Sequence, residues 1–266
     1  MPATRPNFLA VFITAYWDLT RVLRTLWAPA LVTLLLYMAV QFTTSVVIPL
    51  FAQTYIARMV LVQLVALAGF VILAPFLMAT HRFILVDEVA TVSDIATVTP
   101  RVTRFAGWFL ALMAVWSVPV AFAFLTQPTA PVYYVTRPQL ATGAPRELAL
   151  FALTISAYAI VTRMMIILAA AATDARSLSV GNALADTRGN AFYIVLATFL
   201  CGVPLSVALF LLFGALQVLP FTAKALAAYL LLNLALFVTL TLGACIASRV
   251  YQAMGDCLNR APAPQA

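Results

Sequence analysis

The chain has 266 residues, of which 65% are hydrophobic and only 9% are charged, and its mean hydropathy is +1.05. Soluble domains carry about 25% charged residues, so this composition excludes a soluble fold and predicts an integral membrane protein. The net charge of +7 comes from fourteen arginines and one lysine against eight acidic residues. Because these cations lie beside apolar segments, we expect them to orient the chain and to meet anionic membrane lipids, and we expect no binding to nucleic acid.

Residues 7–26 read as an amphipathic helix. Its apolar residues recur at steps of three and four: Phe8, Phe12, Ala15, Leu19, Val22 and Leu26. The pattern fits either a helix half-sunk among the lipid headgroups or one packed on the bundle. Asp18, Arg21 and Arg24 stand where a signal peptide would have small residues. We therefore expect this segment to be retained.

Six apolar segments follow, each long enough for the roughly 20 residues that a transmembrane helix needs. They cover residues 27–50, 59–80, 105–126, 147–172, 191–216 and 225–248. Pro75 is expected to kink the second segment near its end. Residues 127–146 are expected to form an ordered surface loop between the third and fourth segments. The fold class predicted is an all-α polytopic membrane helix bundle with six transmembrane helices.

A polar-edged helix followed by two spans occurs three times. The second such helix is expected to begin with Ser93 as its N-cap and to continue to Arg104, and the third to begin at Ser179. Together with residues 7–26, these make about three interfacial amphipathic elbow helices. They predict a threefold internal repeat, with units of about 7–88, 93–174 and 177–256, within a single membrane domain of residues 1–266.

The arginines predict the orientation. Ten of them lie on the side of the elbow helices, whereas three arginines and the lysine lie on the other side. Cytoplasmic loops carry an excess of Lys and Arg. The sequence therefore predicts a multi-pass protein of the bacterial inner membrane with both termini cytoplasmic.

Arg163 precedes Asp174 by eleven residues, which is roughly 16 Å along a continuous helix. Such a helix places Arg163 inside the hydrocarbon core, where an arginine is costly. One interpretation is structural: the side chain snorkels or binds backbone carbonyls. The other is an anion or lipid headgroup site of Arg163, Asp174 and Asn233. Asn233, the backbone near Pro75 and a lipid phosphate are the candidate partners of Arg163.

Two further groups of polar residues are candidates. The cytoplasmic elbow, Asp186, Arg188, Gly189 and Asn190, is expected to bend the chain into the fifth span. The boundary cluster, His81, Arg82, Asp87 and Glu88, marks the return of the second span to water. His81 is interpreted either as one half of a His–carboxylate pair or as a boundary histidine bonded to backbone or lipid.

The catalytic and metal motifs are missing. Cys201, Cys245 and Cys257 show no paired spacing, and His81 is the single histidine, so neither a disulfide framework nor a zinc site is expected. No nucleophile motif or phosphate-binding glycine loop appears. We therefore expect no enzyme and no cofactor.

Arg163, the alanine-rich run after it and the pattern from Ser179 to Ala183 to Thr187-Arg-Gly-Asn190 resemble a known family. The family comprises uncharacterised bacterial six-span inner-membrane proteins, which resemble the membrane domain of glycerophosphoryl diester phosphodiesterases. The segments 81–88 and 248–251 share the likeness. It implies a six-helix fold of three units and no established activity. The sequence contains no phosphodiesterase domain, so no such chemistry is implied.

The function expected is therefore that of a non-enzymatic inner-membrane protein. It would act in envelope or lipid homeostasis, or as an accessory subunit of a membrane assembly with a protein partner. The alternative is a transporter of a small molecule or lipid. A polar cavity past Arg163 would favour transport. A dry, alanine-packed interior would favour the non-enzymatic role without transport.

Overall fold

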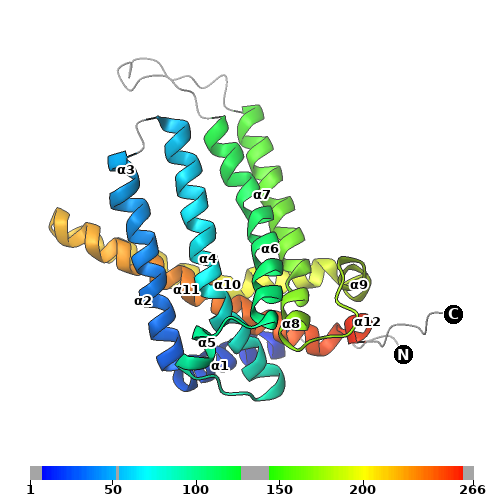
Figure 1. Cartoon of the computed structure of the whole chain (residues 1–266). Helices are drawn as coiled ribbons and strands as arrows, with labels where there is room; N and C mark the ends of the chain where they lie inside the picture. Colours follow the sequence, from blue (N-terminus) through cyan, green and yellow to red (C-terminus); the bar gives the residue numbers. More distant parts are fainter. Residues whose placement is uncertain (1–7, 52–53, 127–143, 260–266) are drawn as a thin grey trace.

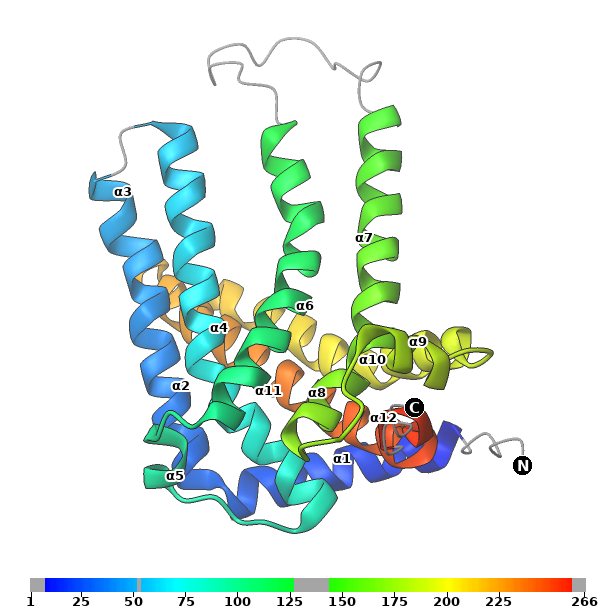
Figure 2. The same ribbon diagram turned by 45° about the vertical axis from the view of Figure 1, so that its right-hand side comes forward.

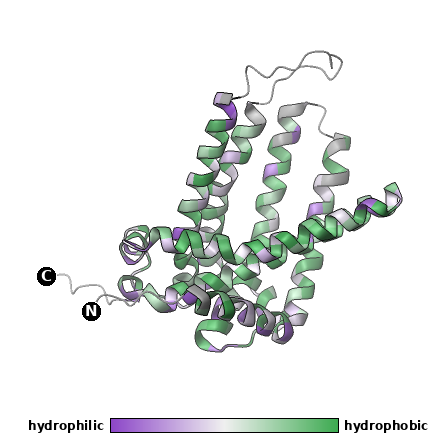
Figure 3. Ribbon diagram, turned by 180° about the vertical axis from the view of Figure 1, so that it is seen from behind, coloured by the Kyte–Doolittle hydropathy of each residue, from purple (hydrophilic) through white to green (hydrophobic). Residues whose placement is uncertain are grey.

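The computed structural model describes residues 8–51, 54–126 and 144–259. These residues form helices and short connections, with no strand among them, and the predicted all-α membrane bundle is confirmed. Within these ranges, five helices are long and apolar enough to cross a membrane, and the bent pair α1–α2 brings the number to as many as six. Hydrophobic residues cover most of the length of the long helices (Figure 3).

The first hairpin begins with α1 (Phe8–Thr25), which meets α2 (Trp27–Phe42) at an angle of 88°. A π-helical turn, η1 (Thr43–Val47), and α3 (Ile48–Phe51) extend α2 without a break in the helical backbone. The chain returns in α4 (Tyr55–Val86), which continues past Pro75.

The second hairpin contains α5 (Val92–Ala96), α6 (Pro100–Leu125), α7 (Ala144–Met164) and α8 (Ile166–Ala172). The expectation of one helix from Ser93 to Arg104 is wrong. Thr91 is the N-cap of α5 and forms a capping box with Asp94, and the helix stops at Thr97, whose backbone is extended. A residue before a proline is pushed toward extended backbone, which explains why α6 starts only at Pro100.

The third hairpin contains α9 (Val180–Asp186), α10 (Ala191–Ala215), the 3₁₀ turn η2 (Leu216–Val218) and α11 (Phe221–Met254), followed by α12 (Asp256–Asn259). Ser179 is the N-cap of α9, as predicted, and accepts a hydrogen bond from the Asn182 amide. In Figures 1 and 2, α10 and α11 run obliquely across the more upright α2, α4, α6 and α7.

The core lies at one end of the bundle, which we call the elbow end because α1, α5 and α12 lie there (Figure 2). Most of residues 73–83 of α4 and 241–254 of α11 are buried, as is every residue of α8. These three segments contact one another. In the preceding parts of α4 and α11, residues 57–72 and 221–240, most of the described residues are exposed or half-buried.

The short helices pack in a cyclic order. The opening helix of the first unit, α1, packs on α11 of the third, α5 packs on α4 of the first, and α9 packs on α7 and α8 of the second. A threefold arrangement would place each opening helix in this way. The repeat itself stays a prediction, to be tested by superposing the three units.

Candidate functional site

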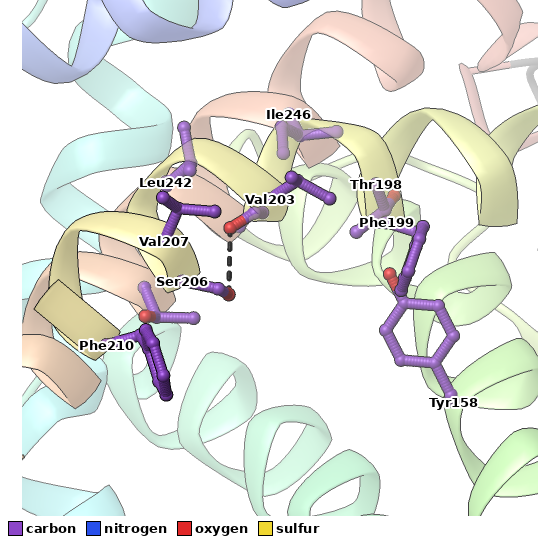
Figure 4. A pocket seen from close by; sticks show the side chains of 12 residues that line it. Tyr158, Thr198, Phe199, Val203, Ser206, Val207, Phe210, Leu242 and Ile246 are labelled. Atoms are coloured by element: carbon purple, nitrogen blue, oxygen red, sulfur yellow. Dashed lines mark hydrogen bonds between the residues drawn. The ribbon is translucent and has the colours of Figure 1, made fainter.

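An apolar groove lies between α7, α10 and α11 and has a volume of about 480 Å³. Figure 4 shows Tyr158 of α7 beside Phe199 at one end and Phe210 at the other, with Leu242 and Ile246 of α11 behind. The groove has room because of its glycines. A Cβ at Gly202 would meet no described atom of a neighbouring element within 4 Å.

The serine and threonine hydroxyl groups along the groove are engaged by their own helices. Ser206 donates to the carbonyl of Gly202 at 3.0 Å (Figure 4), and Thr198 donates to Ile194 at 2.9 Å. Thr239 donates to the carbonyl of Ala235 at 2.7 Å. With these hydrogens used, the groove presents mainly rings, methyl groups and methylenes. Such a surface suits a hydrocarbon chain better than a polar solute.

A second, inner cavity of about 250 Å³ adjoins the groove. Both are lined by Tyr158, Thr198, Thr239 and Gly243. The inner cavity reaches the centre of the bundle, between α4, α6, α7, α8 and α11. Its other lining residues include Phe70, Leu77, His81, Phe109, Leu112, Met113, Trp116, Met165 and Leu168. Groove and cavity together lie in the size range of small-molecule sites, about 300–1,000 Å³.

His81 lies in the wall of the inner cavity and is completely buried. Its Nδ1 lies 2.8 Å from Oγ of Ser248 on α11, and its ring packs against Phe105. This partner, Ser248, is one that neither interpretation of His81 named, because His81 lies on the face of α4 that meets α11, more than a turn before the helix ends at Val86. Its position at a membrane boundary stays a prediction.

The rest of the boundary cluster lies apart from His81. Arg82 donates to the carbonyl of Ala172 at 2.9 Å and forms an ion pair with Glu88. The hydrogen bond from Arg82 holds the pKa of the Glu88 carboxyl below its usual range. Asp87, the left-handed C-cap of α4, lies 3.7 Å from Arg21 in an exposed pair. These residues join chain segments, and neither carboxylate is hydrogen-bonded to His81.

Arg163 contacts α9. Its Nε donates to Oγ1 of Thr187 at 2.8 Å, and its Nη2 donates to the carbonyl of Leu184 at 3.0 Å. A backbone carbonyl was one of the partners anticipated, but it comes from the end of α9, where helices leave carbonyls unpaired. The turn at Met165 keeps helical backbone, and residues 145–172 form one helix long enough to cross a membrane, as the sequence predicts.

The structure gives Arg163, Asp174 and Asn233 separate partners, so it does not support one joint site. Asp174 has left-handed backbone beyond the end of α8 and is bound by Arg101 and by Arg104, the latter at 2.6 Å. Asn233 is buried and donates to the carbonyl of Tyr229 in its own helix at 2.8 Å.

The elbow residues end α9 and hold the chain that follows α11. Asp186 accepts the amides of Cys257 at 2.7 Å and Leu258 at 3.0 Å, at the start of α12. Gly189 has a φ of +80°, a conformation that glycine adopts without strain. Asn190 is the N-cap of α10, and Arg188 is exposed. The elbow therefore does bend the chain into α10.

Sequence reasoning missed the buried ion pair between Asp18 and Arg249. Arg249 donates to both carboxylate oxygens of Asp18, at 2.6 and 2.7 Å, and Asp18 is only 1% exposed. A signal was present: Asp18 lies between Ala15 and Val22 at the spacing of the apolar face. A charged residue in that stripe predicts a buried partner.

In residues 8–51, 54–126 and 144–259, no group of three or more His, Cys, Asp or Glu side chains is arranged to hold a metal ion. The most developed concave feature is the apolar groove with its inner cavity. No family model, no curated protein and no solved structure matches the chain. The relation to the six-span family therefore stays a prediction from the residues quoted for it.

Proposed function

We propose that this integral membrane protein binds an elongated apolar molecule, such as the hydrocarbon chain of a lipid, in the groove and the inner cavity. The observation that supports the proposal is the shared wall of the two, Tyr158, Thr198, Thr239 and Gly243, between α7, α10 and α11. In this proposal the protein is non-enzymatic and acts in lipid or envelope homeostasis, alone or as a subunit of a larger membrane assembly.

A ligand of this kind would enter sideways from the bilayer. The groove borders on α10, whose surface is rich in exposed apolar side chains such as Phe199, Val203 and Phe210. Lipid chains are as apolar as these side chains, so binding depends on shape and contact, with little hydrophobic driving force. The aromatic rings at both ends of the groove supply such contact surface.

The test is to fill the groove. Gly202→Phe places a ring where a Cβ meets open space, and Gly214→Phe makes the same change on α10 at a glycine that lies outside the groove. Native mass spectrometry of the purified proteins should show a lipid retained by the wild type and by Gly214→Phe and lost from Gly202→Phe. Equal retention by both variants would contradict the proposal.

A lipid transporter is the second candidate, because the groove leads to the centre of the bundle. Reconstitution into vesicles with a fluorescent phospholipid separates the two roles. A binding protein leaves the rate of exchange between leaflets unchanged, whereas a transporter raises it, and Gly202→Phe should abolish that rise.

We also propose that the elbow end faces the cytoplasm of a bacterial cell and that the bound or neighbouring lipids are anionic. The support is the excess of arginine on that side. Cysteines introduced at Thr129 and Gln265, in a chain without its three native cysteines, would be probed with a membrane-impermeant thiol reagent. Labelling at Thr129 alone is expected in intact cells, and labelling at Gln265 alone would reverse the orientation.

A further inference from the structure

We infer that the inner cavity selects amphiphiles that carry a hydroxyl or N–H donor, and that Nε2 of His81 is the acceptor for that donor. The inference rests on the proposed function, because it specifies which apolar molecules are held. It starts from an imidazole nitrogen that is buried and has no hydrogen-bond partner in the described part of the chain.

The hydrogen bonds around His81 fix which nitrogen carries the proton. Ser248 has one hydroxyl hydrogen, and Oγ of Ser248 lies 2.9 Å from the carbonyl of Ala244, which can only accept. The hydroxyl hydrogen is therefore used there, and Ser248 acts as an acceptor toward Nδ1 of His81 at 2.8 Å. We therefore assign the ring hydrogen to Nδ1. In the neutral ring Nε2 is then left with a lone pair and no hydrogen.

An unpaired acceptor in an apolar wall is costly, and a ligand that supplies a donor relieves that cost. His81 lines the inner cavity together with apolar side chains such as Leu77 and Phe109. A pure hydrocarbon would leave Nε2 unpaired, whereas a long-chain alcohol or amide would satisfy it. The chemistry recognised is thus a hydrocarbon chain bearing one hydrogen-bond donor.

His81 has no exposed surface in the structure, so a ligand reaches Nε2 only when side chains of the cavity wall change rotamer. Met113 and Met165 line the same cavity. Methionine is unbranched and has three rotatable side-chain bonds, so it adapts to ligands of different shape. The wall therefore contains residues suited to opening it.

The test compares two probes with the same chain, 1-hexadecanol and hexadecyl methyl ether, for binding to purified full-length protein in nanodiscs. The ether lacks only the donor. Wild-type protein should bind the alcohol about tenfold more tightly, a difference of about 1.4 kcal/mol and within the range of one hydrogen bond. His81→Leu should bind both probes with similar affinity. Thermal unfolding confirms that each variant is folded.

Two further variants separate recognition from structure. Ser248→Ala removes the acceptor that holds the hydrogen on Nδ1, so Nε2 is free to carry it and donate to the ether oxygen. The preference for the alcohol should then shrink because the ether binds better. Thr241→Val removes a buried hydroxyl of α11 that lines neither the groove nor the inner cavity, so it should leave the preference at about tenfold.

Equal binding of the two probes to wild-type protein would overturn the inference and leave the proposed function intact. A preference that survives in His81→Leu, or one that disappears in Thr241→Val, would also overturn it. Binding of neither probe to the wild type would count against the proposed function as well. If Gly202→Phe is the one variant that binds neither probe, the result would support the groove as the route by which both probes reach the cavity.

Discussion

The two ends of the bundle differ in how their helices are packed. At the elbow end, α8 is an Ile-Leu-Ala helix buried at every position, and the adjoining parts of α4 and α11 are nearly as closed. Away from the elbow end, apolar side chains such as Phe151 of α7 and Leu226 of α11 are more than 60% exposed. The elbow end is held together by contacts between helices. The exposed apolar side chains elsewhere are suited to contact with lipid.

The difference shows what holds helices together inside a bilayer. Lipid chains are as apolar as leucine, so apolar residues alone give little reason for helices to approach. The elbow end supplies other reasons: alanines that let backbones come close, and ion pairs such as Asp18–Arg249 and Arg104–Asp174. The groove and the inner cavity lie beside these packed segments: Leu242 and Ile246 of α11 line the groove, and His81 and Leu168 line the cavity.

The largest effect expected is on the buried ion pair at the elbow end. Arg249→Leu leaves the carboxylate of Asp18 buried without its partner, and removing one member of a buried pair costs about 3–5 kcal/mol. Unfolding of the purified protein by SDS titration should report a loss of this size. The double variant Asp18→Leu/Arg249→Leu should recover most of it, because no unpaired charge is left.

The exposed pair of Arg21 and Asp87 is the control, since Asp87 is 84% exposed. Asp87→Asn removes the charge and tolerates the left-handed backbone, so it should cost less than about 1 kcal/mol. A similar cost for Arg249→Leu and Asp87→Asn would contradict the contrast between buried and exposed pairs.

The next effect is on close packing. Ala170 in α8 is 0% exposed, so Ala170→Leu forces extra methylenes into a filled space and should cost about 1–3 kcal/mol. The same change at the exposed Ala152 of α7 should be nearly neutral. Thermal unfolding in detergent compares the two. If Ala152→Leu lowers the unfolding temperature more than Ala170→Leu does, the contrast between the two ends is contradicted.

A smaller loss of stability is expected from removing the hydrogen bonds by which Arg163 links α7 to α9. Arg163→Leu removes two hydrogen bonds of a half-buried guanidinium and should cost about 1–2 kcal/mol. Hydrogen exchange should show faster exchange confined to the amides of α9. Arg188→Leu, at an exposed arginine of the same elbow, should leave this exchange unchanged. Unfolding that spreads through the whole bundle would show that Arg163 has a wider role.

The smallest effect concerns pH. Arg82 lowers the pKa of Glu88 in the folded chain, so the contribution of this pair is fully present above the unfolded pKa, near 4.5. It is lost as the pH falls through the lowered folded pKa. Since Glu88 is half exposed, the loss should stay below about 1 kcal/mol. Unfolding measured between pH 6 and about 3 should show a smaller acid-dependent change in Glu88→Gln than in the wild type, and an equal change would assign it to other carboxyls.

Hydropathy alone predicted the long helices, because a membrane span must be long and apolar. The apolar spacing in residues 7–26 likewise matches the buried face of α1, including Leu19 and Val22. Local chemistry also located the N-cap at Ser179. These features depend on residues close together in the chain.

The site depends on which helices meet, and the sequence does not contain that information in any local pattern. Gly202 and Gly243 read as ordinary small residues until α7 and α10 are seen to leave space beside them. His81 reads as a boundary residue until Ser248 of α11 is found against it. Arg163 reads as an unpaired charge within a span until Thr187 and the carbonyl of Leu184, at the end of α9, are found against it.

The most direct measurement of the central claim is an experimental density map of the full-length protein in a lipid nanodisc. The groove and the inner cavity should contain an elongated density that enters beside Phe199 and Tyr158 and passes Gly243. In Gly202→Phe the density should be absent while the helices keep their positions. A wild-type map in which α7, α10 and α11 close together and leave no space for a ligand would contradict the claim.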